Sequence, residues 1–229
     1  MILLLSVVMM MGCRQSRYLR PLADLEQVEA AAVGYRQKIT ELSAQIRTYE
    51  EGLSRLAGQR GQLAVLQKLL ALEYLDRGMY ADALAALQEA RAIDTENPVL
   101  FYFTGVAAAR LAKNTLARST RDHFFADAEW SYRRALALDP AYAEALYALS
   151  VLLVLELGRP LEAETLLLRL LERQQRHFGG MFIQAAMYVQ TDRTNQALEV
   201  YQQIERLSPD SANRAQALAN RQALERKAP

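Results

Sequence analysis

Residues 71–98 read ALEYLDRGMYADALAALQEARAIDTENP, and this stretch holds the pattern that decides the fold. Ala71, Tyr74 and Gly78 place a small residue, an aromatic residue and a glycine at the spacing of one helix and its end. Small and apolar residues then recur on a second helix before a proline: Ala83, Leu87, Ala90 and Pro98. Similar sets return about every 34 residues, which is typical of stacked helix pairs that bury their apolar faces against one another.

Three further sets follow this one along the chain. Their members are Phe101, Gly105, Ala108, Ala128, Tyr132 and Ala135, then Leu146, Leu149, Leu153, Ala163, Leu167 and Leu170, then Met181, Ala185, Tyr188, Ala197, Tyr201 and Ile204. The step from Gly105 to Ala128 is much longer than the step from Ala71 to Ala83, so an insertion near 113–125 separates these two helices. The insertion is either an extension of a helix or a projecting loop that contacts a partner.

These positions resemble the tetratricopeptide repeat (TPR) family, whose units carry a small residue, an aromatic residue, two alanines and a proline at set positions. The resemblance covers 64–209. The chain departs from the family pattern at Gln67, Thr95 and Leu170, where tryptophan, proline and alanine are usual. The resemblance implies an all-α fold, a right-handed α-solenoid of stacked helix pairs.

The resemblance also divides the chain into an array and a closing helix. About four helix pairs are expected over 63–210. Asp210 is suited to cap the start of a last helix, which is expected over 211–229 as the solvent-facing end of the array.

In the TPR family, the first helix of each unit lines a concave groove that holds a protein partner. Carried over to this chain, the resemblance implies a groove lined by Lys68, Leu72, Asp76, Tyr102, Val106, Arg110, Tyr147, Val151, Val154, Phe182, Val189 and Gln190. These side chains are largely apolar and aromatic, which suits an amphipathic helix or an extended peptide. Leu72 and Phe103 stand where relatives that grip a terminal carboxylate have asparagines, so that clamp is not expected. The alternative occupant is the chain's own N-terminal or C-terminal helix.

A second feature is the apolar run at the start of the sequence. It is too short to span a bilayer, which takes about 20 residues, but it matches the core of a signal peptide. Met10 to Cys13 resembles the bacterial lipobox, which implies a signal peptide over 1–12, lipid with palmitate on Cys13 and a tether over 13–20. The alternative is a buried free cysteine in an ordinary helix.

The lipobox resemblance also implies a location. The mature chain is expected to be lipid-anchored in the cell envelope and to face the periplasm. Arg14 follows the cysteine, in place of the aspartate associated with inner-membrane retention, which favours the outer membrane.

Residues 21–62 carry an apolar seam that suits a long helix. Its members alternate steps of three and four, as in a coiled coil: Leu25, Val28, Ala32, Tyr35, Ile39, Leu42, Ile46, Tyr49, Leu53 and Leu56. The helix either folds back on the array or pairs with a helix of another molecule. Pairing with another copy of the chain would give a homo-oligomer, and the other possible partner is a different protein. Two tyrosines in the seam favour packing within the chain. Gly58 and Gly61 predict a helix break before the array.

Charge and composition exclude several classes of function. The 229 residues include 27 basic and 26 acidic side chains, so no long-range field favours nucleic acid. A single cysteine rules out an intrachain disulfide and a thiolate metal cage. His123 and His177 lie far apart without ligand-spaced neighbours, so no metal site and no cofactor are expected.

No catalytic residues are assigned, because the sequence holds no nucleophile elbow and no glycine-rich phosphate loop. The sequence therefore predicts a non-enzymatic, membrane-anchored TPR lipoprotein that acts as a protein-binding adaptor or scaffold in the bacterial envelope. One alternative is a ligand-capture subunit that holds a small hydrophobic molecule for a transporter. Another is a structural protein that self-assembles through its N-terminal helix.

Overall fold

The computed structural model describes residues 33–50 and 60–226, which belong to two separate compact units. The first unit is described as one helix over 33–50. Inside it the Thr40 and Thr48 hydroxyls donate to the carbonyls four residues earlier, at 2.8 and 3.0 Å. The signal peptide, Cys13, the tether, the first part of the heptad helix and the last residues of the chain lie outside the described residues. Which partner covers the heptad seam stays a prediction.

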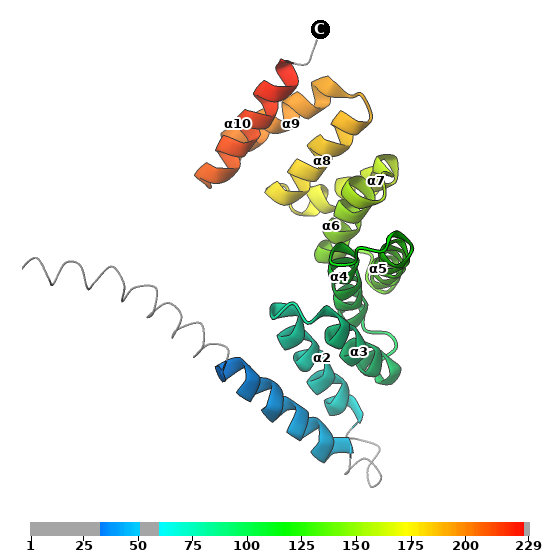
Figure 1. Cartoon of the computed structure of the whole chain (residues 1–229). Coiled ribbons are helices and arrows are strands. Elements are labelled where there is room, and N and C mark those ends of the chain that lie inside the picture. The colour runs from blue at the N-terminus through cyan, green and yellow to red at the C-terminus, as the bar shows by residue number, and fades with distance from the viewer. Residues whose placement is uncertain (1–32, 51–59, 227–229) are drawn as a thin grey trace, which may run out of the picture. The chain divides into compact units, whose positions relative to one another are not determined.

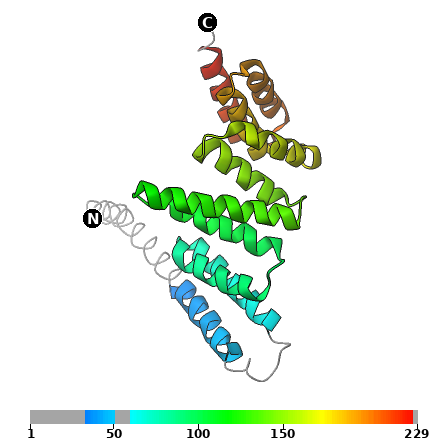
Figure 2. The same cartoon turned by 90° about the vertical axis from the view of Figure 1, so that its right-hand side faces the viewer.

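The second unit is an array of antiparallel helix pairs that stack side by side (Figures 1 and 2). Its elements are α2 (Arg60–Asp76), α3 (Tyr80–Ile93), α4 (Pro98–Lys113), α5 (Arg118–Leu138), α6 (Ala143–Val151), the π-helical turn η2 (Leu152–Glu156), α7 (Pro160–Arg173), α8 (Phe178–Gln190), α9 (Thr194–Leu207) and α10 (Ser211–Glu225). The described part of the chain contains helices and no strand. The predicted all-α solenoid is thereby confirmed, with α10 as its closing helix.

Small side chains let the helices of this array pack closely. Ala83, Ala90, Ala128 and Ala135 are completely buried, as the repeat pattern requires. Gly105 makes the tightest of these contacts, because a Cβ atom there would lie 2.5 Å from the Tyr132 ring. Any larger residue would displace that ring, so glycine sets the distance between α4 and α5.

Side-chain caps and left-handed residues fix where the helices begin and end. The Asn97 side chain accepts from the Val99 N–H at 3.0 Å, and the Asp210 side chain accepts from the Ala212 N–H at 2.9 Å. Gly78 and Gly158 adopt positive φ angles of 71° and 62° between paired helices, where a residue with a Cβ atom would be strained.

The long step in the second pair is a helix extension. Helix α5 is 21 residues long, and only 114–117 separate it from α4. Phe125 is buried in the largest apolar cluster and Phe124 packs against the same cluster, so burial holds the added turns in place. The predicted insertion near 113–125 is thus mostly helical. The side chain of Leu116, in the short link before α5, is almost completely exposed.

Helix α2 is described from Arg60 onward. The break predicted at Gly58 and Gly61 falls at the edge of residues 51–59, which lie outside the described residues together with the last part of the heptad helix. The boundary between the heptad helix and the array therefore stays a prediction.

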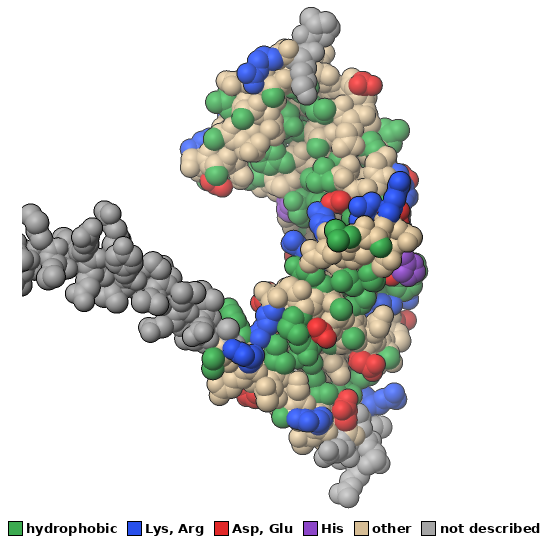
Figure 3. Space-filling model, viewed as in Figure 1, with side chains coloured by type: hydrophobic (Ala, Val, Ile, Leu, Met, Phe, Trp, Pro, Cys, Tyr) green, Lys and Arg blue, Asp and Glu red, His purple; other side chains and the backbone are tan. Residues whose placement is uncertain are grey.

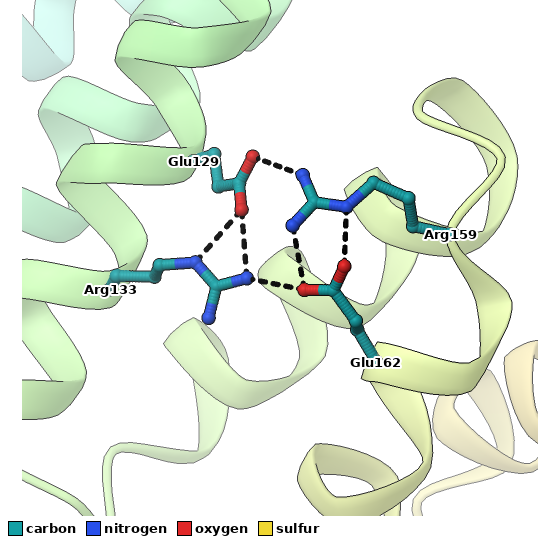
Figure 4. Close-up of polar contacts among 4 residues, drawn as sticks. All are labelled: Glu129, Arg133, Arg159 and Glu162. Atoms are coloured by element: carbon teal, nitrogen blue, oxygen red, sulfur yellow. Dashed lines mark hydrogen bonds and ion pairs between the residues drawn. The ribbon is translucent and has the colours of Figure 1, made fainter.

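Ion pairs join the second helices of neighbouring helix pairs. Arg133 Nε and Arg159 Nη1 donate to Glu129 at 2.8 and 2.7 Å, and Glu162 accepts from both guanidiniums at 2.6 and 2.9 Å (Figure 4). The four groups alternate in charge and close into a ring that ties α5 to α7. One pair further on, Arg193 donates to Glu164 at 2.6 Å.

Candidate functional site

The array contains an open cavity of about 320 Å³ between α4, α5, α6 and η2. It is lined by Tyr102, Val106, Ala109, Arg110, Lys113, Phe125, Tyr132, Tyr147, Ala148, Val151, Leu152 and Glu156. Hydrophobic side chains, with Lys and Arg among them, face the hollow side of the array (Figure 3). The volume lies at the lower end of the range for ligand sites, about 300–1,000 Å³.

Tyrosine rings form much of the wall, and glycines make room for them. Tyr102 lies 6.2 Å from Tyr132 between ring centroids, and Tyr147 lies 4.8 Å from His177. A Cβ atom at Gly179 would lie 3.0 Å from the Tyr147 hydroxyl oxygen. The glycines of α4 and α8 therefore position two of the rings that shape the cavity.

His177 also holds the start of α8. Its Nδ1 atom accepts from the Gly180 N–H at 2.8 Å, which caps the helix. This hydrogen bond requires an unprotonated Nδ1, so the Tyr147–His177 contact belongs to the neutral form of the ring.

The charges at the rim are unequal. Lys113 Nζ lies 2.6 Å from Glu156 Oε1, so an ion pair joins α4 to η2 across the cavity mouth. Arg110 lies one turn before Lys113 on α4, is exposed and forms no ion pair with any described residue. The lining therefore carries two cations and one carboxylate, which leaves one positive charge without a partner.

The hydroxyls of Tyr102 and Tyr132 stay protonated at neutral pH. Burial raises the pKa of Tyr102, and the nearby Glu144 charge adds to the rise while Arg110 opposes it. Burial also raises the pKa of Tyr132 far above its usual value. Both hydroxyls are thus neutral groups that can donate hydrogen bonds, and the Arg110 charge acts on both of them.

A π-helical turn shapes the fourth side of the cavity. In η2 the Leu157 N–H donates to the Leu152 carbonyl at 3.0 Å, a step of five residues. Gly158 is the sixteenth residue after the N-cap Tyr142, whereas Asp192 is the fifteenth after the N-cap His177 in the next pair. One extra residue is therefore accommodated as the wide turn.

This turn explains a wrong prediction. Val154 was expected to line the groove, but it is 2% exposed and belongs to the buried core. Leu152 and Glu156, the first and last residues of η2, line the cavity instead. Gln190, which was also predicted to line the groove, donates from Nε2 to the Val154 carbonyl at 3.1 Å and so supports η2.

The remaining predicted residues fall into two sets. Five of them meet in the cavity: Tyr102, Val106, Arg110, Tyr147 and Val151. The others lie outside it on α2 and α8: Lys68, Leu72, Asp76, Phe182 and Val189. Phe182 packs against Tyr201 of α9, with ring centroids 6.4 Å apart.

Sequence reasoning did not assign five further lining residues that matter here. They are Lys113, Phe125, Tyr132, Leu152 and Glu156. The extra residue between Tyr142 and Gly158 was the sequence signal that could have assigned Leu152 and Glu156 to the lining. Lys113 could have been assigned because it follows Arg110 by three residues and so lies on the same helix face.

Among residues 33–50 and 60–226, no three His, Cys, Asp or Glu side chains are grouped closely enough to hold a metal ion. Within the same ranges, every helix is too short or too polar to cross a bilayer.

Comparisons with known proteins agree with this architecture. A TPR repeat-containing protein of Borreliella burgdorferi is 23% identical over 177 residues, which cover 77% of this chain and 77% of that protein. A thermophilic TPR protein of Thermus thermophilus superposes with a TM-score of 0.59 at 19% identity, over 80% of this chain and 92% of that one. YrrB, described as a TPR protein with an unusual peptide-binding site, superposes with a TM-score of 0.61 at 20% identity, over 80% and 86%. No family model matches the chain.

Proposed function

We propose that this chain, which has the fold of the tetratricopeptide repeat proteins, is a non-enzymatic adaptor that binds a partner protein in the cavity between α4, α5, α6 and η2. The observation that carries the proposal is the cavity itself. Its lining combines apolar and tyrosine side chains with Arg110, a cation that forms no ion pair with any described acidic residue. Such a surface gains both buried area and a charge-assisted hydrogen bond from a peptide.

The ionisable groups of the cavity support binding over catalysis. A general acid or base works best with a pKa near the operating pH. Burial moves the pKa of Tyr102 and Tyr132 away from neutrality, and Lys113 is held by Glu156. A peptide-binding site is also what the name of YrrB records for that protein.

Membrane anchoring through Cys13 is part of the proposal. It is supported by the apolar run and Gly12 before the cysteine. Two acyl chains on the cysteine and one on its amino group would hold the adaptor stably, because each buried methylene contributes about 0.8 kcal/mol. We place the anchored protein in the bacterial envelope, facing the periplasm, with the outer membrane favoured by Arg14.

The anchor is tested by metabolic labelling with palmitate. The wild-type chain should incorporate label and sediment with membranes, whereas Cys13→Ala should do neither. Because the chain has no second cysteine, equal incorporation into both forms would contradict a lipid on Cys13. That result would leave the proposal for the cavity unaffected.

The adaptor role is tested with a photo-crosslinking residue placed at Val106 or Val151 in the cells that encode the protein. We expect discrete adducts to another protein from these positions. Leu161 and Leu168, which are exposed on α7 outside the cavity, serve as matched controls and should give none. Equal adduct patterns from all four positions contradict the proposed site.

A further inference from the structure

We propose that the partner is a peptide segment in which a bulky apolar side chain stands beside an acidic residue. The apolar side chain enters the cavity, and the acidic residue pairs with Arg110. This inference rests on the proposed function and names the chemistry of the partner. It treats the site as selective for one kind of sequence.

The cavity has room for a large apolar side chain. Its volume of about 320 Å³ is at the bottom of the range for ligand sites, and its inner surface includes Val106, Val151 and Leu152. The rings of Tyr102, Tyr132 and Tyr147 add flat walls. Aromatic side chains bury large areas in such walls and prefer edge or offset contacts with rings, so Phe, Tyr, Trp or Leu suits the space.

The charges at the rim select an acidic neighbour. Lys113 already has Glu156 at 2.6 Å, whereas Arg110 has no acidic partner among the described residues. A carboxylate beside Arg110 would form charge-assisted hydrogen bonds with its fork of N–H donors. A lysine or arginine there would meet two like charges on α4, because Arg110 and Lys113 share one helix face.

Two carboxylates restrict where the acidic residue can lie. Glu156 stands on η2 beside Lys113, and the charge of Glu144 reaches the Tyr102 hydroxyl. An acidic residue placed beside Glu156 or Glu144 would meet a like charge, whereas Arg110 has no acidic partner among the described residues, so the partner carboxylate is expected over Arg110. This arrangement predicts a preference for one acidic residue at a fixed step from the apolar residue, and not for a generally acidic peptide.

The π turn is an independent sign that the site is specialised. Such turns are rare and occur mostly as single wide turns at functional positions. Here the turn brings Leu152 and Glu156 to the cavity, and Gln190 of α8 supports it through the Val154 carbonyl at 3.1 Å. The next pair, in which α8 lacks the extra residue, has no such turn.

The test selects binders from random dodecapeptides displayed on phage, with the full chain purified in mild detergent as the target. We expect enriched peptides to share Asp or Glu at a fixed step from Phe, Tyr, Trp or Leu. A labelled synthetic copy of one such peptide should lose about tenfold in affinity for Arg110→Gln. The control Arg173→Gln removes an exposed positive charge on α7 and should bind the peptide like the wild type.

A double-mutant cycle separates this inference from the proposed function. Replacing the acidic residue of the peptide by its amide should weaken binding to the wild type about tenfold and leave binding to Arg110→Gln nearly unchanged. Enriched peptides that lose binding on Val106→Trp but show no acidic preference overturn the inference and leave the peptide-binding groove intact. Peptides that ignore Val106→Trp contradict both.

Other occupants give distinct results in the crosslinking experiment. An adduct from Val106 to a segment of the same molecule would identify the chain's own helix as the occupant. An adduct at twice the mass of the chain would identify a second copy. Either result, obtained in place of an adduct to another protein, overturns the inference.

Discussion

Helix α5 contributes to two faces of the array that carry charge in opposite ways. On one face, Glu129 and Arg133 belong to the closed ring with Arg159 and Glu162, in which each carboxylate accepts from both guanidiniums. On the other face, Tyr132 borders the cavity whose rim leaves Arg110 without an acid. A charge set that closes on itself stabilises the stack of helix pairs, whereas an open one is available to a partner.

The pKa of Glu129 reflects the closed arrangement. Burial acts to raise the pKa of this carboxyl group, but hydrogen bonds from Arg159 and Arg133 outweigh burial and lower it below the usual value. The ring therefore binds the ionised form of Glu129 more strongly than water does. No corresponding set of hydrogen bonds holds Arg110, so the comparison between the two faces can be tested by removing one charge from each.

The largest expected effect comes from Gly105→Ala, which acts at the contact between α4 and the Tyr132 ring beside the cavity. The new Cβ atom would lie 2.5 Å from the Tyr132 ring, so the ring or α5 must move. Overpacking costs about 1–3 kcal/mol, and the better helix propensity of alanine returns about 1. We expect a net loss of up to about 2 kcal/mol in the free energy of unfolding, measured by urea denaturation followed by circular dichroism.

Gly61→Ala is the matched control for this change. Gly61 is also a helical glycine, but a Cβ atom there meets nothing within 4 Å. The substitution should leave stability unchanged or raise it slightly. If Gly105→Ala is as mild as Gly61→Ala, the Tyr132 ring does not set the spacing of α4 and α5.

The repeat pattern predicted the stacking because close packing depends on local composition. Ala83 and Ala90 are seven residues apart, as are Ala128 and Ala135, and all four are completely buried. The form of the insertion could not be predicted in the same way. Whether Phe124 and Phe125 belong to a helix or a loop depends on the distant side chains that bury them.

The cavity was predictable only where the family register holds. Tyr102, Val106 and Tyr147 follow that register and line the cavity. Val154 does not, because one extra residue before Gly158 widens the helix and turns its side chain into the core. The ion-pair ring was not predicted either, because Arg159 lies 30 residues from Glu129 and no local period joins them.

The next effect in size compares one charge removed from each face. Glu129→Gln should lower the free energy of unfolding by about 1 kcal/mol, because two guanidiniums lose one of the two carboxylates they share. Arg110→Gln should change it by less than about 0.5 kcal/mol, because no described acid depends on it. Both values come from urea denaturation at neutral pH and low salt. Equal losses from the two substitutions would remove the distinction between a closed and an open charge set.

The smallest expected effect is the change with pH in the stability difference between the wild type and each charge variant. The pKa of Glu129 is lower in the folded chain than the unfolded value of about 4.3. The unfolded chain therefore takes up a proton first as the pH falls, and the ring's contribution is present above about pH 4.3 and lost as the pH falls through the folded pKa. The stability gap between wild type and Glu129→Gln should narrow from pH 7 toward about pH 3. The gap between wild type and Arg110→Gln should stay flat, because the guanidinium keeps its charge over this range. A Glu129→Gln gap that stays constant in acid would mean that its hydrogen bonds, and not its charge, tie α5 to α7.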